Sequence, residues 1–171
     1  MTAHRTLLAV VAVASLVQGC AGAGASSPSA DLSGRLDDSG VTVVAALTTG
    51  QDGTRQVRAT FTPQKTGYHL YSMDLPPGGV DGLGVPTTVT VGGSLRAAGS
   101  PTANAPVRNL RIEELDVELP VYPDGPITIA VPVRRTGNGR AEVVVTYGAC
   151  SPSNCLAPVR DRVIALAPVR A

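Results

Sequence analysis

The side chains from which most ligand platforms and catalytic centres are built are scarce in this chain. Its 171 residues include no Trp, one Phe, two His and three Cys, and the formal net charge is +1. With so few aromatic rings, the chain lacks the stacking platforms that single-stranded nucleic acids need. The basic residues are scattered, so the basic patch of a nucleic-acid-binding protein is missing as well. We therefore expect no nucleic-acid partner.

The N-terminus is typical of an exported protein. A short basic start, His4 and Arg5, precedes an apolar run over residues 7–17 that is too short for a permanent membrane span. Small residues and a cysteine follow in the stretch LVQGC. This stretch resembles the signal of a bacterial lipoprotein. Residues 1–19 are therefore predicted to be a signal peptide, and Cys20 the lipidated first residue of the mature chain.

The cysteine count agrees with this interpretation. An odd number of cysteines in an exported protein needs an explanation, because oxidising compartments favour pairs. If Cys20 carries lipid, Cys150 and Cys155 remain as an even pair. The small polar residues after Cys20 predict a flexible tether over 20–34, followed by one domain over 35–171. The expected location is the extracytoplasmic face of a bacterial membrane.

The rest of the chain predicts an all-β fold. Several segments alternate apolar and polar residues with the two-residue period of a half-buried strand, and no helical period is found. The clearest are RQVRATF, PITIAVPV and RAEVVVTY, whose inward faces would hold Val57, Ala59, Phe61, Ile127, Ile129, Val131, Val133, Ala141, Val143, Val145 and Tyr147. Further candidates are VTVVAAL, TTVTV, LDVELPV and RVIAL, with Gly- and Pro-rich turns between the runs. About seven to nine strands at this spacing predict an antiparallel β-sandwich.

Pro132 and one long segment are the irregular features of this predicted sandwich. Pro132 has no amide hydrogen to donate, so its strand is expected to lie at an edge or to contain a bulge there. The segment from Gly92 to Arg108 shows no strand pattern. A loop of this length is expected to be either disordered or functional.

Cys150 and Cys155 are the strongest candidates for chemistry. Zinc needs about four ligands, and the mature chain offers only these two cysteines and His69, so we expect no metal and no other cofactor. A nucleophilic dyad of Cys155 with His69 is a less favoured alternative, since such partners meet only in space. A disulfide remains. Its short loop would add little stability, whereas short, exposed disulfides exchange readily, so structural and redox roles both stay open.

The stretch VTYGACSPSNCLAP resembles a motif of the N-terminal periplasmic domain of the thiol:disulfide interchange protein DsbD. In that family a strand with a tyrosine and a cysteine is followed by polar residues, a second cysteine and prolines. The positions that match are Tyr147, Cys150, Cys155, Leu156 and Pro158, and Ala157 replaces the first proline.

A second stretch, KTGYHLYSMDLPPGGVDGLGVPTTVTV, resembles another segment of the same family. It does so through Gly67, Tyr68, His69, Tyr71, Ser72, Gly84, Pro86 and Thr87. Together the two stretches extend the resemblance over most of residues 35–170. The resemblance implies an immunoglobulin-like β-sandwich with the cysteine pair at one end of its sheets.

The resemblance also implies a chemistry, which is dithiol–disulfide exchange. Cys155 would form the bond with the partner and Cys150 would resolve it. Tyr68, Tyr71, Tyr147 and Pro158 are expected to line the site. Between the two tyrosines of the second stretch, His69 is expected to point to the opposite face and to lie at the surface. Residues 92–108 are the candidate for the cap loop that shields the cysteines in this family.

The expected partners follow from the same resemblance. A thioredoxin-like protein or a membrane thiol reductase, present as a separate polypeptide, would donate electrons, and an oxidised exported protein would accept them. The alternative function is a non-catalytic binding or assembly lipoprotein in which the disulfide only holds a loop in place.

Overall fold

The computed structural model describes residues 30–169, which form an immunoglobulin-like antiparallel β-sandwich. One layer contains β1 (Ala30–Asp38), β2 (Val41–Thr49), β3 (Arg55–Pro63) and β10 (Ile127–Arg135). The other contains β5 (Thr88–Gly93), β11 (Ala141–Tyr147) and β13 (Val159–Pro168). The layers are joined at one side by β1 and β13, which share only the pairs Leu32–Pro168 and Ser33–Ala167.

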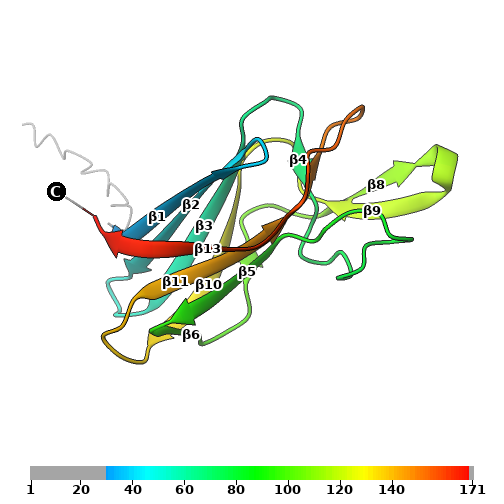
Figure 1. The fold of residues 1–171 in the computed structure, drawn as a ribbon. Coiled ribbons are helices and arrows are strands. Elements are labelled where there is room, and N and C mark those ends of the chain that lie inside the picture. The colour runs from blue at the N-terminus through cyan, green and yellow to red at the C-terminus, as the bar shows by residue number, and fades with distance from the viewer. Residues whose placement is uncertain (1–29, 170–171) are drawn as a thin grey trace, which may run out of the picture.

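Shorter strands complete the molecule. The strands β6 (Leu95–Ala97) and β7 (Thr102–Ala103) pair with β10, and β4 (His69–Leu70) pairs with β12 (Ala149–Cys150). The strands β8 (Arg108–Ile112) and β9 (Val117–Val121) form a hairpin that is closed by a short 3₁₀ turn, Glu113–Leu115. Figure 1 shows this hairpin extending from the end of the sandwich at which β4 lies. No helix within residues 30–169 is long and apolar enough to cross a membrane.

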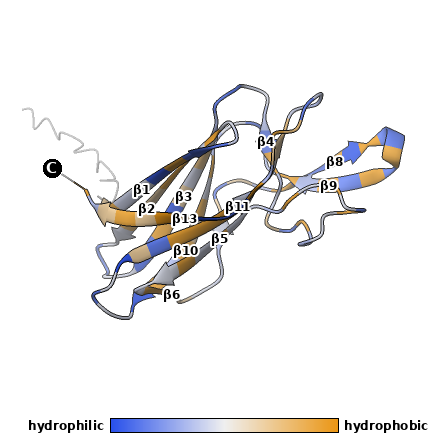
Figure 2. Cartoon of the chain, viewed as in Figure 1, coloured by the Kyte–Doolittle hydropathy of each residue, from blue (hydrophilic) through white to orange (hydrophobic). Residues whose placement is uncertain are grey.

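The core lies between the two layers. All the inward-facing residues predicted for RQVRATF, PITIAVPV and RAEVVVTY are buried, so the predicted alternation is confirmed. Alternate residues of a strand point to opposite faces, which is why apolar residues at every second position form this core. The rings of Phe61 on β3 and Tyr147 on β11 meet edge to face, with centroids 5.5 Å apart, and so connect the layers. Figure 2 shows orange, apolar residues along the strands of the sandwich, interrupted by white and blue polar ones.

Pro132 lies in β10 at a break in the pairing of that strand. On one side β10 pairs continuously with β3, where Pro132 is opposite Gln56. On the other side the pairing with β7 ends at Ala130, and the pairing with β6 begins at Val133. The Pro132 carbonyl accepts a hydrogen bond from the Ala98 amide, so its nitrogen also faces this interrupted side, where no donor is needed. The irregularity expected at Pro132 is therefore a break between β7 and β6 on the outer side of β10, while the pairing of β10 with β3 is continuous.

Two sequence predictions are corrected by the fold. Residues 92–108, the candidate cap loop, do not line the cavity that adjoins the cysteines, and two short parts of the segment pair with β10 as β6 and β7. The domain also begins earlier than residue 35, since β1 already pairs with β2 at Ala30. The sequence of β1, ADLSGRLDD, is mostly polar and small, so its apolar alternation is weak. The predicted signal peptide and the lipidation at Cys20 lie outside the described residues.

Truncation of the Phe61 side chain is expected to destabilise the fold strongly. Phe61 is fully buried, so Phe61→Ala should lower the free energy of unfolding by about 3–5 kcal/mol through lost burial and an unfilled cavity. The measurement is equilibrium unfolding in urea. The control is Val163→Ala, because Val163 is 56% exposed on the outer face and its loss should cost no more than about 0.5 kcal/mol. Equal losses in the two variants would contradict this placement of the core.

Candidate functional site

The two cysteines form a disulfide at the end of the sandwich. The sulfurs of Cys150 and Cys155 are bonded at 2.03 Å, and their Cα atoms are 4.0 Å apart. The chain between them turns back tightly, because the Ser151 amide donates to the Asn154 carbonyl at 2.8 Å. The pairing of these cysteines, which was one of three alternatives for them, is therefore present in the structure.

The two halves of the disulfide differ in exposure. Cys150 belongs to β12 and is 5% exposed, whereas Cys155 lies in the exposed loop that follows. Thiol–disulfide exchange begins with attack of a thiolate on an accessible sulfur. The arrangement therefore favours Cys155 as the residue that an incoming thiolate attacks, with Cys150 as the leaving group.

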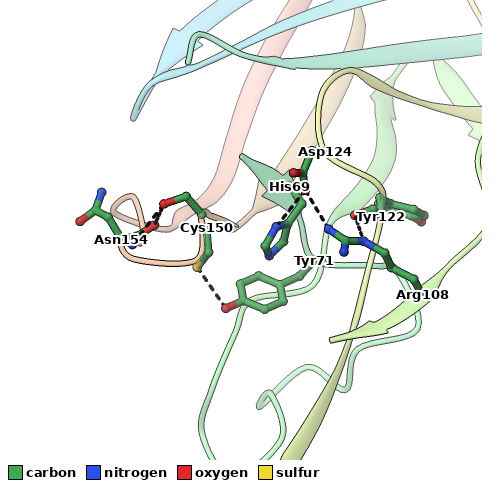
Figure 3. Close-up of polar contacts among 8 residues, drawn as sticks. His69, Tyr71, Arg108, Tyr122, Asp124, Cys150 and Asn154 are labelled. Carbon is green, nitrogen blue, oxygen red and sulfur yellow. Dashed lines mark hydrogen bonds and ion pairs between the residues drawn. The ribbon is translucent and has the colours of Figure 1, made fainter. Parts of the chain in front are cut away.

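Tyr71 contacts the buried half of the disulfide. Its hydroxyl oxygen lies 3.1 Å from the Cys150 sulfur, as Figure 3 shows. A disulfide sulfur carries no hydrogen, so Tyr71 is the donor in this contact. Burial raises the pKa of the Tyr71 hydroxyl, which keeps the proton on it at neutral pH. If the disulfide opens, the same hydroxyl is positioned to donate to a Cys150 thiolate, and hydrogen bonds to charged groups are the stronger kind.

Two glycines make room for the Tyr71 ring. A Cβ atom at Gly84 would lie 2.9 Å from the ring, and one at Gly148 would lie 3.1 Å from it. Gly84 also has a φ of +84°, which only glycine adopts readily. The backbone of Tyr71 is fixed on both sides, since its amide donates to the Gly148 carbonyl and its carbonyl accepts from the Thr87 hydroxyl at 2.6 Å. Gly84 and Thr87 belong to the second stretch that resembles the DsbD domain.

Tyr68 contacts the cysteine loop at a different place. Its hydroxyl accepts a hydrogen bond from the Asn154 side-chain amide at 2.9 Å, which lowers the pKa of Tyr68. The two tyrosines therefore divide the contacts with this loop. Tyr71 touches the sulfur of Cys150, and Tyr68 holds the outer part of the loop.

His69 is buried, so the prediction that it lies at the surface is wrong. It is 2% exposed and is the cross-strand partner of Cys150 in the β4–β12 pair. Its Nδ1 atom lies 3.4 Å from the Asp124 carboxylate, which also binds Arg108 at 2.7 Å. The face of β4 that alternation assigns to solvent is covered here by Arg108, at the start of the β8–β9 hairpin, and by Asp124. Figure 3 shows this group of side chains.

The environment of His69 favours its neutral form. Burial lowers the pKa of the imidazole, and the nearby Arg108 guanidinium lowers it further, whereas Asp124 acts in the opposite direction. The Nε2 atom is buried and has no hydrogen-bond partner among the described residues. The Tyr71 ring lies nearly perpendicular to the imidazole of His69, with the two ring centroids 6.4 Å apart.

A cavity of about 350 Å³ adjoins the disulfide. Both cysteines, Tyr71 and Pro158 line it, so these predicted site residues lie together. Sequence reasoning missed the other side of the cavity, which is formed by residues of the segment 77–85, and it missed Arg160 on β13. Of these residues, Gly84 was among the positions that match the DsbD domain, but no site role was predicted for the segment, because its Gly- and Pro-rich run was expected to form a turn.

Tyr147 is a core residue and is not part of the cavity lining. It is 1% exposed, and its hydroxyl donates to the Asp38 carbonyl at 2.9 Å. Burial raises the pKa of Tyr147 to about 12. Tyr147 was predicted to line the site beside the cysteines, but it lies underneath them, between the two layers.

Over residues 30–169 there is no group of three or more His, Cys, Asp or Glu side chains that could hold a metal ion.

Removal of the Tyr71 hydroxyl is expected to slow cleavage of the disulfide. A hydrogen bond to a charged group contributes about 1.5–3 kcal/mol, so Tyr71→Phe should lower the rate of reduction by dithiothreitol about tenfold or more. Tyr68→Phe is the matched control, because its hydroxyl contacts Asn154 and not a sulfur. Its rate should change by less than about threefold. Equal rates in Tyr71→Phe and in the unchanged protein would show that the Tyr71 hydroxyl does not stabilise the leaving Cys150 thiolate.

Acidification is expected to destabilise the protein through His69. Because burial lowers the folded-state pKa, the unfolded chain binds a proton at higher pH than the folded chain does. The free energy of unfolding should therefore fall as pH decreases below about 6.5, by at most about 1.4 kcal/mol per pH unit. Urea unfolding between pH 7 and pH 5 measures this effect, and His69→Asn should abolish it. An unchanged pH dependence in the variant would assign the effect to another group.

No protein-family model and no curated protein matches the sequence. The structure is similar to the N-terminal periplasmic domain of ScsB from Proteus mirabilis, with a TM-score of 0.55 and 14% identity over 81% of this chain and 51% of that chain. This chain thus spans about half the length of the ScsB chain that it matches.

A second similar structure is the N-terminal domain of DsbD from Neisseria meningitidis in the reduced form. Here the TM-score is 0.45, with 17% identity over 79% of this chain and 83% of that chain. The ScsB match, at its low identity, shows the fold. The chain has the fold of the N-terminal periplasmic domain of ScsB, which agrees with the immunoglobulin-like sandwich that the two sequence stretches implied.

Proposed function

We propose that this protein is an extracytoplasmic thiol:disulfide exchange domain. It passes reducing equivalents through Cys150 and Cys155, from a thioredoxin-like protein or a membrane thiol reductase to oxidised exported proteins. The observation that carries the proposal is the unequal environment of the two sulfurs. Cys155 is exposed, whereas Cys150 is buried and receives a hydrogen bond from Tyr71. A disulfide that only holds a loop in place has no need of a hydroxyl donor on one sulfur.

In the first half of the cycle the domain is reduced. A thiolate of the electron donor attacks the Cys155 sulfur, the bond between Cys155 and Cys150 breaks, and Cys150 leaves as a thiolate. Tyr71 donates a hydrogen bond to that thiolate and lowers the energy of the step. The second thiol of the donor then attacks the mixed disulfide. The donor leaves oxidised, and Cys150 and Cys155 are both reduced.

In the second half the domain reduces its substrate. The Cys155 thiolate attacks one sulfur of the substrate disulfide, and the other substrate sulfur leaves as a thiolate. Cys150 then attacks Cys155 in the mixed disulfide and releases the reduced substrate. Two electrons have passed from the cysteine pair to the substrate, and the Cys150–Cys155 disulfide is restored.

The extracytoplasmic location and the membrane attachment are part of the same proposal. The first stretch of the chain has the pattern of a lipoprotein signal that ends at Cys20. A disulfide persists in oxidising compartments, which agrees with export. The ScsB domain of similar fold is itself named as periplasmic. We infer that Cys20 carries lipid and holds the domain at the outer face of a bacterial membrane.

The test is to trap the mixed disulfide. Cys150→Ala keeps the attacking sulfur and removes the resolving one, so this variant should accumulate a covalent complex with a disulfide-bonded partner in an extracytoplasmic extract, either an oxidised exported protein or the oxidised form of a thioredoxin-like protein. Non-reducing gel electrophoresis followed by mass spectrometry identifies the complex. Cys155→Ala is the matched control, and it should trap no partner because the remaining sulfur is buried.

Two outcomes would contradict the exchange function. One is a Cys150→Ala protein that captures neither an oxidised exported protein nor a thioredoxin-like protein. The other is a Cys150–Cys155 reduction potential below about −300 mV, which is typical of structural disulfides. A value of roughly −180 to −270 mV, the range of exchange catalysts, would support it.

A further inference from the structure

The cavity beside the disulfide has walls that carry almost no charge. Leu83, Val85, Leu156 and Pro158 contribute apolar surface to it. Among residues 30–169, the one charged residue that lines the cavity is Arg160. A single charge next to walls of low polarity produces a stronger field than the same charge on an open polar surface.

No acidic side chain of the described chain forms a salt bridge with Arg160. Its neighbour on β13, Arg162, is paired with Asp38 at 3.0 Å. The intervening Asp161 lies outside the cavity lining and accepts a hydrogen bond from the Thr146 hydroxyl. The positive charge of Arg160 is therefore available to a group that enters the cavity.

We propose that Arg160 selects disulfide substrates that carry negative charge beside the reacting sulfur. This inference rests on the exchange function proposed above. Arg160 lines the same cavity as Cys155, the sulfur that forms the mixed disulfide. An anionic group next to the substrate disulfide is attracted as the substrate enters, and a cationic group is repelled, while a neutral substrate is unaffected.

One rim of the cavity leaves room for the backbone of a polypeptide substrate. The segment 77–85 lines it with Gly78, Gly82 and Gly84. A Cβ atom at Gly78 or Gly82 would meet nothing within 4 Å, so this rim is free of obstructing side chains and a substrate backbone can approach it. The substrate class is thus a disulfide-bonded segment of an exported protein with Asp or Glu next to its cysteine.

Three small disulfides test this selection without knowledge of the natural partner. They are oxidised glutathione, which is anionic, cystamine, which is cationic, and 2-hydroxyethyl disulfide, which is neutral. The reduced full-length protein is mixed with each one, and the rate of its oxidation is followed at low ionic strength. We expect the ratio of the glutathione rate to the cystamine rate to fall about fivefold in Arg160→Gln, and further in Arg160→Glu. Added salt should lower the ratio of the unchanged protein in the same direction.

Arg162→Gln is the matched control, because it removes the same charge from the same strand outside the cavity. It should leave the ratio unchanged. For every variant the rate with the neutral disulfide is measured as well, so that an effect on the reactivity of Cys155 itself is separated from an effect on charge selection. If the neutral disulfide reacts normally and Arg160→Gln keeps the ratio of the unchanged protein, charge selection by Arg160 is wrong while exchange stands. If the unchanged protein reduces none of the three disulfides, the exchange function itself is wrong.

Discussion

The contact between Tyr71 and Cys150 is the interaction on which the site depends. The Tyr71 ring packs in a buried cluster with Leu75, Leu119 and Val121, and Cys150 belongs to the same cluster. The ring therefore joins three parts of the chain, namely the cysteine loop, the segment after β4 and the β8–β9 hairpin. A shift of this ring would remove both the burial and the hydrogen-bond donor of the Cys150 sulfur. Gly84 and Gly148 are small because the ring occupies the space beside them.

The strands of the sandwich could be predicted from the sequence because each buries one face. In β3, β10 and β11 the burial of every second residue is a direct result of strand geometry, so a period of two in the sequence is sufficient to find it. The site could be predicted for a different reason. The spacing of Cys150 and Cys155 and the stretch around Tyr71 resemble those of a known domain, and the ScsB match agrees with that resemblance in its fold.

The parts that could not be predicted depend on contacts between distant segments. His69 was predicted to lie at the surface because the alternation of residues assigns its face of β4 to solvent. In the structure Arg108, at the start of the β8–β9 hairpin, and Asp124 cover this face. Residues 92–108 lack a strand period because β6 and β7 are short edge strands, which need only a few backbone hydrogen bonds with β10. Arg160 lies near the disulfide because the start of β13 runs beside the cavity, and no motif in the sequence indicates this position.

The direction of β1 has a consequence for how the domain meets other molecules. Near its start, β1 pairs with the last residues of β13, where Leu32 lies opposite Pro168. β1 ends at Asp38, whose carbonyl accepts a hydrogen bond from the Tyr147 hydroxyl below the cysteine loop. At Gly40, just beyond β1, an added Cβ would lie 3.2 Å from Leu156, next to Cys155. The strand has nine residues, which span about 30 Å at the usual rise. A domain held at the Ala30 end therefore presents its disulfide at the opposite end of the sandwich, facing away from whatever holds it.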